Sequence, residues 1–182
     1  PVLDIPVVGA HEIIGDRALG RDAEMIAELG RALSEGIMAE GVLPIIKHIP
    51  GHGRAKSDSH KELPIVDTPR DELEKTDFVP FELMAEMPWA MTAHVVYTAI
   101  DAERAATLSP VIIDDVIREK IGFEGLLLSD DIGMEALSGT KGERARTILT
   151  AGCDLALECS GKIEDMTEVA SIVPKMTEEA MK

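Results

Sequence analysis

The sequence is poor in aromatic residues, in basic residues and in long apolar runs. Only 3% of its 182 residues are aromatic, and 18 Lys and Arg stand against 34 Asp and Glu, giving a formal net charge of −16. Because phosphate binding needs clustered basic side chains, this charge argues against a nucleic-acid partner, and equally against an anionic membrane surface. No apolar run approaches the roughly 18 residues of a membrane-spanning helix.

Cysteine is scarce as well. Cys153 and Cys159 flank the apolar run 154–158, and an extended segment of that length holds them too far apart for a disulfide. We therefore predict two free, buried thiols, which agree with a reduced, cytoplasmic compartment.

What the sequence does contain is an alternation of short apolar segments with helical patterns. Apolar runs of strand length occur at five places, which are Val2–Ile5, Leu43–His48, Trp89–Val96, Gly125–Ser129 and Asp154–Glu158. The first helical pattern ends at Gly41, and its apolar stripe consists of Met25, Ile26, Leu29, Leu33 and Ile37. Further helices are predicted over 143–151 and 163–173.

Two Pro-containing pairs predict helix starts. Thr68 with Pro69, and Ser109 with Pro110, each place an N-cap residue before a proline at the first helical position. The helix after Ser109 is expected to end at Gly122.

Apolar strands that alternate with helices predict an α/β fold with a parallel sheet. An open doubly wound sheet and a (β/α)8 TIM barrel both fit this pattern, and the lack of a Gly-rich phosphate loop weakens the first. Polar residues follow the predicted strands at the end where barrels build active sites, namely Asp4, Lys47, His48, His94, Asp130 and Asp131.

Five strands cannot close an eight-stranded barrel. We therefore expect residues 1–182 to form a single partial TIM-barrel catalytic domain that lacks its N-terminal part and holds about five of eight strands. An open arc exposes sheet edges and apolar helix faces, so we expect the isolated chain to self-associate.

The densest polar cluster is KHIPGHGRAKSDSH, residues 47–60. Its histidines are credible metal ligands, so a metal-dependent hydrolase using His48, His52 and His60 is one interpretation. The spacings match no common zinc pattern, however, and Lys47 would repel a cation. Alternatively, Asp58 and His60 lie two residues apart in an extended segment and point to one side, as a carboxylate does that orients a general acid/base.

A second cluster is GLLLSDDIGM, residues 125–134, where two adjacent acids end a buried strand. Glycosidases need a carboxylate to meet an oxocarbenium-like transition state, and Asp130 is the better candidate. Asp131 is expected to cap the following helix. Upstream, Arg17 in IGDRALGRD is a candidate for binding a carboxylate or sugar hydroxyls.

The motifs PGHG and DSH, followed by SDDIGM, with IGDRALG upstream and MTAHVVY between, resemble those of the family 3 glycoside hydrolases. Across all 182 residues the chain is similar to the β-N-acetylglucosaminidases of that family that act in peptidoglycan recycling. The resemblance implies a (β/α)8 barrel, a cytoplasmic location and no metal or organic cofactor. A family aspartate that binds the sugar, near the N-terminal part, has no counterpart here.

The same resemblance implies a role for each site residue. Asp130 matches the nucleophile, His60 the acid/base and Asp58 its partner, while Arg17, Lys47 and His48 match residues that hold the hydroxyls of the terminal N-acetylglucosamine. The implied reaction retains the anomeric configuration. The implied substrates are small molecules, N-acetylglucosaminyl-1,6-anhydro-muramic acid and its peptide-bearing forms. A non-catalytic sugar-binding barrel stays open as an alternative, and protein partners are unknown.

Overall fold

The computed structural model describes residues 1–178 and 180–181, and a four-stranded parallel sheet lies at its centre. The strands are β1 (Ile45–Ile49), β3 (Trp89–Thr92), β6 (Leu126–Asp131) and β7 (Leu155–Leu157), arranged in that order. Each neighbouring pair is parallel, so the predicted parallel sheet is confirmed. A doubly wound sheet reverses its strand order at one point, and the described strands instead follow chain order throughout.

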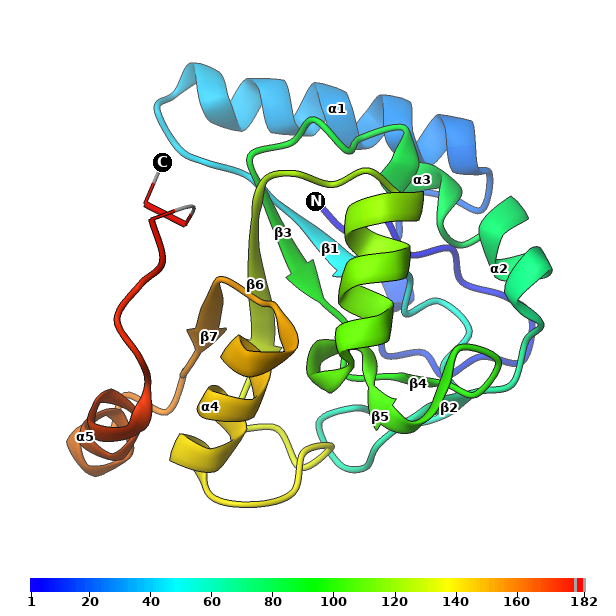
Figure 1. Cartoon of the computed structure of the whole chain (residues 1–182). Coiled ribbons are helices and arrows are strands. Elements are labelled where there is room, and N and C mark those ends of the chain that lie inside the picture. The colour runs from blue at the N-terminus through cyan, green and yellow to red at the C-terminus, as the bar shows by residue number, and fades with distance from the viewer. Residues whose placement is uncertain (179, 182) are drawn as a thin grey trace.

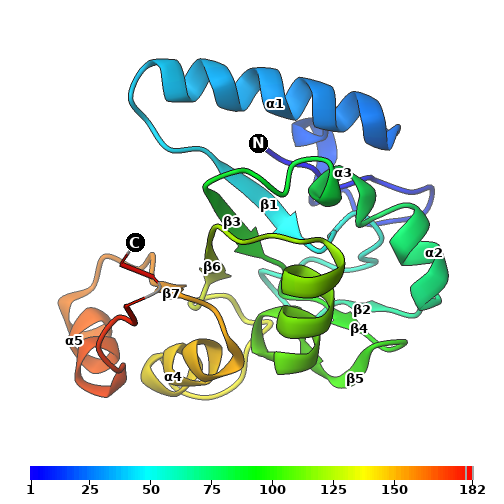
Figure 2. The same ribbon diagram turned by 45° about the horizontal axis from the view of Figure 1, so that its top comes forward.

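Helices lie along the outside of this curved sheet. Figures 1 and 2 show α1, α3 and α4 following one another around it, in chain order. The helices are α1 (Ala23–Ala39), α2 (Arg70–Lys75), α3 (Val79–Glu82), the π-type helix η3 (Ile112–Lys120), α4 (Lys141–Ala151) and α5 (Ile163–Ile172), with short 3-10 turns η1 (Gly15–Arg17) and η2 (Ala106–Leu108).

A second, three-stranded sheet consists of β2 (Ile65–Val66), β4 (Val96–Tyr97) and β5 (Asp101–Ala105). The predicted continuous strand 89–96 is therefore wrong, because the chain leaves the main sheet after Thr92. The segment that follows finds other partners: the Val96 N–H donates to the Pro64 carbonyl at 2.9 Å. The Tyr97 hydroxyl donates to the Gly51 carbonyl at 2.6 Å. These bonds hold the small sheet against the loop that follows β1.

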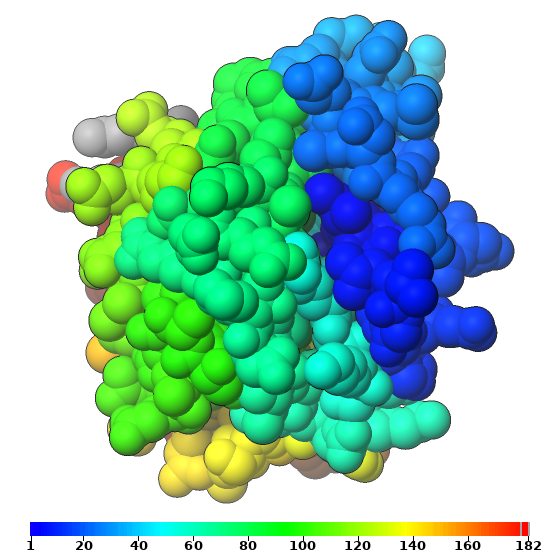
Figure 3. Space-filling view, turned by 90° about the vertical axis from the view of Figure 1, so that its right-hand side faces the viewer, coloured from blue at the N-terminus to red at the C-terminus, as the bar shows by residue number. Residues whose placement is uncertain are grey.

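The predicted strand 2–5 shrinks to a single parallel bridge between Val2 and Lys47. Beyond it the Asp4 side chain, rather than a neighbouring strand, accepts the next N–H groups of the β1 segment. The N-terminal segment then runs along the loop after β1, where the Val7 N–H donates to Gly53 at 3.2 Å. Figure 3 shows these dark-blue residues packed against the cyan ones.

Helix ends follow the sequence signals in most places. The Ser109 hydroxyl accepts from the Ile112 N–H at 3.2 Å, and Gly122 adopts a φ of 76°, as a helix stop requires. The Thr68 cap is wrong: α2 begins after Pro69 without a side-chain cap. The Thr68 hydroxyl instead lies 3.5 Å from an Arg54 nitrogen.

Helix α1 buries a different face from the predicted stripe. Small residues of α1 face the core. At Gly30 the helix approaches Leu3 so closely that an added Cβ would lie 2.7 Å from the Leu3 side chain. As a result, Met25, Leu29 and Leu33 are 53%, 45% and 46% exposed, and only Ile26 of the stripe is fully buried.

Both cysteines are free, as predicted, but only one of them is buried. Burial raises the pKa of the Cys153 thiol to about 12. Cys159 is exposed, because it lies beyond the end of β7.

The helices of the described residues are all too short or too polar to cross a membrane.

Met25, Leu29 and Leu33 form an exposed apolar stripe along α1. We expect the isolated chain to associate through apolar surface, and replacing Leu29 and Leu33 with Gln to reduce that association. Sedimentation velocity measures it, with the Glu28→Gln and Glu35→Gln double variant on the same helix as the matched control. A monomeric chain that unfolds in one sharp transition contradicts the expectation.

Candidate active site

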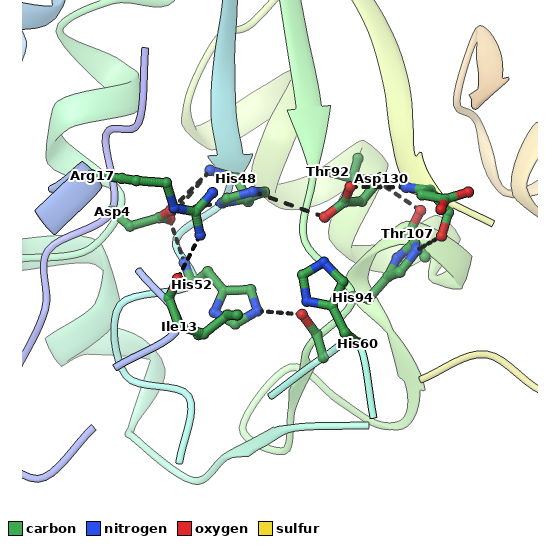
Figure 4. A network of polar contacts seen from close by, with 12 residues as sticks. Asp4, Ile13, Arg17, His48, His52, His60, Thr92, His94, Thr107 and Asp130 are labelled. Carbon is green, nitrogen blue, oxygen red and sulfur yellow. Dashed lines mark hydrogen bonds and ion pairs between the residues drawn. The ribbon is translucent and has the colours of Figure 1, made fainter. Parts of the chain in front are cut away.

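A pocket of about 120 Å³ lies at the carboxyl ends of β1 and β6. Its polar lining comes from the segment before α1, the β1 strand, the loop after it and the end of β6. Six residues that the sequence marked as candidates line it, namely Arg17, Lys47, His48, His52, His60 and Asp130. Figure 4 shows Arg17, His48 and Asp130 around this space.

An irregularity in β1 brings two successive side chains to the pocket. In a regular strand neighbouring side chains point to opposite faces. Here Lys47 pairs with Met91 and Ile49 with Thr92, so the register shifts around His48. Such irregularities re-aim side chains, and both Lys47 and His48 line the pocket.

The His48 ring lies between two carboxylates. Its Nδ1 is 2.7 Å from Asp4 Oδ2, and its Nε2 is 3.8 Å from Asp130 Oδ2. Figure 4 draws both contacts. Burial acts to raise the pKa of the Asp4 carboxyl, but His48 and the His52 backbone N–H outweigh it and hold that pKa below its ordinary value. A buried carboxylate thus stays ionised behind the pocket.

Asp58 and His60 form a close pair at the pocket's rim. The ring Nδ1 and the backbone N–H of His60 both lie 2.9 Å from Asp58 Oδ1. The backbone N–H of His60 acts first to lower the pKa of Asp58, and the His60 ring adds to this, so the carboxyl titrates below its usual range. The His60 side chain is 61% exposed, so it can reach a substrate that enters from solvent.

The loop between His48 and His60 is fixed in place by hydrogen bonds and close packing. His52 Nε2 lies 3.0 Å from the Ser59 hydroxyl, and both side chains are buried. Gly53 allows the close approach of the N-terminal segment, because a Cβ there would lie 2.0 Å from the Ile5 carbonyl oxygen. Arg54 binds Asp77 at 2.6 Å on the outer side. The loop that carries the Asp58–His60 pair therefore has a fixed base.

Asp130 and Asp131 diverge, as two adjacent strand residues must. Asp131 Oδ1 accepts from Gly133 at 2.8 Å and from Cys159 at 3.3 Å, so it caps a turn after β6. The predicted helix cap is wrong, because the next helix begins at Lys141 and Thr140 caps it. Asp130 alone of the two lines the pocket.

His94, one of the polar residues that follow the predicted strands, lies next to the Asp131 backbone. It is buried, and its Nε2 lies 3.1 Å from the Asp131 carbonyl oxygen. Burial lowers the pKa of His94. Its contact is with the backbone next to Asp130, so it packs against the end of β6.

Arg17 lies in η1 and is exposed at the pocket's edge. One guanidinium nitrogen donates to the Ile13 carbonyl at 2.6 Å, which fixes the side chain and leaves its other N–H groups available to a ligand.

The three histidines of the loop line the same pocket but have different hydrogen-bond partners. His48 contacts Asp4, His52 contacts Ser59 and His60 contacts Asp58. Among the residues that the structure describes, no group of three or more His, Cys, Asp or Glu side chains is arranged to hold a metal ion.

Sequence reasoning missed the connections of Asp4 and His52. In the sequence Asp4 lies at the end of an apolar run. This position identifies it as a polar residue at a strand end but does not indicate its hydrogen-bond partners. The His52–Ser59 contact joins two residues of one loop, and no periodic pattern predicts such a pair.

The family model described as "Glycosyl hydrolase family 3 N terminal domain" matches residues 1–182. The chain belongs to this family. A curated relative, the "Beta-hexosaminidase" of Alkalilimnicola ehrlichii, is 43% identical over 164 residues, which cover 88% of this chain and 47% of that protein. The chain thus spans about half the length of this curated relative.

Two solved structures are similar to the chain throughout. One is a glycoside hydrolase family 3 β-N-acetylglucosaminidase from Paenibacillus, with a TM-score of 0.89 and 34% identity over 94% of this chain and 34% of that one. The other is NagZ from Neisseria gonorrhoeae in complex with N-trifluoroacetyl-D-glucosamine, with a TM-score of 0.86 and 35% identity over 99% of this chain and 52% of that one. These likenesses agree with the family resemblance of the sequence motifs.

Proposed function

We propose that the protein is a retaining exo-β-N-acetylglucosaminidase. The observation that carries this proposal is the pairing, around one small pocket, of a strand-end carboxylate, Asp130, with a histidine that a carboxylate orients, His60 with Asp58. Retaining glycosidases need a nucleophile and an acid/base at one site. The relatives named for hexosaminidase and N-acetylglucosaminidase activity support the substrate class.

In the proposed first step an Asp130 oxygen forms a bond to the anomeric carbon while the glycosidic C–O bond breaks. Protonated His60 gives its proton to the leaving oxygen, so the aglycone departs as an alcohol. In the second step neutral His60 takes a proton from water, whose oxygen attacks the anomeric carbon and releases Asp130 as a carboxylate. Asp58 holds the His60 ring through Nδ1, which leaves Nε2 for both proton transfers.

Arg17, Lys47 and His48 are proposed to hold the hydroxyls of the terminal sugar. All three residues line the pocket, and hydrogen bonds from the charged Arg17 and Lys47 side chains, together with one to His48 Nε2, fix the orientation of a neutral sugar. The small volume of the pocket favours one terminal sugar ring, as an exo-acting enzyme requires.

We also propose the complete fold, the natural substrates and the cellular role that go with this activity. Strands in chain order, with helices outside the curved sheet, support residues 1–182 as part of a (β/α)8 barrel. The natural substrates are proposed to be N-acetylglucosaminyl-1,6-anhydro-muropeptides, hydrolysed in the cytoplasm during peptidoglycan recycling. The similarity to NagZ is the support for this setting.

Covalent trapping tests the nucleophile. We expect a fluorinated N-acetylglucosaminide with a good leaving group to inactivate the complete protein and to label Asp130, because the fluorine slows release of the intermediate. Peptide mass spectrometry locates the label. The Asp130→Asn variant loses labelling and turnover, whereas Asp131→Asn, which removes a carboxylate outside the pocket, keeps both. A label on any other residue refutes the assignment, and sugar binding without turnover favours a non-catalytic module.

Chemical rescue tests the acid/base. We expect His60→Ala to lower kcat/KM at least about 10²-fold on substrates with poor leaving groups. Added azide restores turnover of a dinitrophenyl N-acetyl-β-glucosaminide and gives the β-glycosyl azide, because azide needs no general base. The matched control is His11→Ala, an exposed histidine outside the pocket. An α-azide product, or no rescue in a folded variant, contradicts the role of His60.

Chelation separates the proposal from the metal-hydrolase alternative. We expect turnover of nitrophenyl N-acetyl-β-glucosaminide to be unchanged after dialysis against EDTA, because Asp130 and His60 supply all the chemistry. Activity that EDTA removes and a divalent cation restores favours the alternative.

A further inference from the structure

The buried carboxylate of Asp4 has no role in the proposed reaction, yet all its hydrogen-bond donors come from the segment that builds the pocket. Asp4 Oδ1 accepts the His52 N–H at 2.6 Å, and both oxygens lie within 3.3 Å of the His48 N–H. Asp4 Oδ2 lies 2.7 Å from His48 Nδ1. The Asp4 side chain is fully buried, so solvent cannot replace these partners.

The two ring nitrogens of His48 have different surroundings. Nδ1 lies at hydrogen-bond distance from Asp4, whereas Nε2 lies 3.8 Å from Asp130 Oδ2, beyond the length of a hydrogen bond. An ionised carboxylate can only accept, so the short contact requires a proton on Nδ1. The depressed pKa of Asp4 agrees with an ionised acceptor.

We propose that Asp4 is a positioning residue that keeps the ring proton of His48 on Nδ1 and away from Asp130. In the neutral ring Nε2 then carries a lone pair. It accepts from a sugar hydroxyl and gives no hydrogen bond to Asp130. The opposite tautomer would place an N–H against Asp130 Oδ2, and a hydrogen bond there would withdraw electron density from the nucleophile.

This inference rests on the proposed function for its effect on rate, but not for the state of the ring. The first experiment therefore measures the ring alone. In the complete protein labelled with ¹⁵N-histidine, long-range ¹H–¹⁵N spectra report which His48 nitrogen carries the proton, and loss of the signals in His48→Gln assigns them. We expect a protonated Nδ1 and an unprotonated Nε2 in the wild-type protein, and a ring protonated on both nitrogens overturns the proposal. An unprotonated Nδ1 overturns the proposal, and this measurement needs no Asp4 variant to fold.

The second experiment changes Asp4 to Asn, which has nearly the same shape. The side-chain oxygen of the introduced Asn can still accept the His52 N–H. In that orientation the NH2 group of the amide faces His48 Nδ1, so Nδ1 must become the acceptor. We expect the ring proton to move to Nε2 and kcat to fall at least about 10²-fold, less than the loss of about 10⁴-fold that a wrong tautomer causes where the histidine is itself the general base. An Asp4→Asn variant that keeps the proton on Nδ1 overturns the proposal.

Two controls separate positioning from a general loss of structure. Asp154→Asn also changes a part-buried carboxylate, which accepts from the Arg118 side chain and the Leu127 N–H at the opposite end of the sheet. It should leave the His48 signals and kcat within about 3-fold of wild type. In a His48→Gln background, Asp4→Asn should cost less than about 3-fold more, because its partner is already gone. Fully additive losses show that Asp4 does not act through His48.

If the wild-type protein does not hydrolyse N-acetyl-β-glucosaminides, the proposed function fails while the tautomer result stands. If turnover is normal and Nδ1 is unprotonated, the function stands and the role of Asp4 fails.

Discussion

The arrangement of the pocket depends on one buried carboxylate. Asp4 takes three N–H groups from the segment that leaves β1, two of them from His48 and one from the backbone of His52. Burying an unpaired charge costs several kcal/mol, so this carboxylate stabilises the fold only with all its donors in place. The N-terminal segment and the loop after β1 therefore have a fixed relative position, and the pocket lies beside that junction.

The pocket combines a rigid half with an exposed half. His48 and Asp130 come from strands of the parallel sheet and are largely buried, with side-chain exposures of 7% and 18%. The Asp58–His60 pair lies on a loop whose base His52, Ser59 and Arg54 hold in place. A nucleophile on a strand keeps its direction, whereas an acid/base on a loop can follow a proton between the leaving group and water. The proposed reaction uses both properties.

The sequence predicted the parallel sheet well, because buried strands carry continuous apolar runs and their order follows the chain. It also predicted that Arg17, Lys47, His48, His60 and Asp130 belong to one site, and the structure brings them to one pocket. The face of α1 was predicted wrongly, since Gly30 packs against Leu3 and small residues rather than the largest ones decide which face is buried. The break after Thr92 depends on a partner far along the chain, the Pro64 carbonyl, which no local pattern contains. Asp131 caps a turn rather than a helix, because the next helix begins only at Lys141. Asp4 was missed as a support because its partners are 44 to 48 residues away, and the His52–Ser59 contact was missed because it joins two residues of an irregular loop.

The most direct test of this account is a crystal structure of the complete protein with N-acetylglucosamine bound. The account predicts the sugar in the pocket, its anomeric carbon facing Asp130 and its ring hydroxyls within hydrogen-bond distance of Arg17, Lys47 and His48. A sugar bound outside this pocket, or a metal ion held by His48, His52 and His60 in its place, would contradict it.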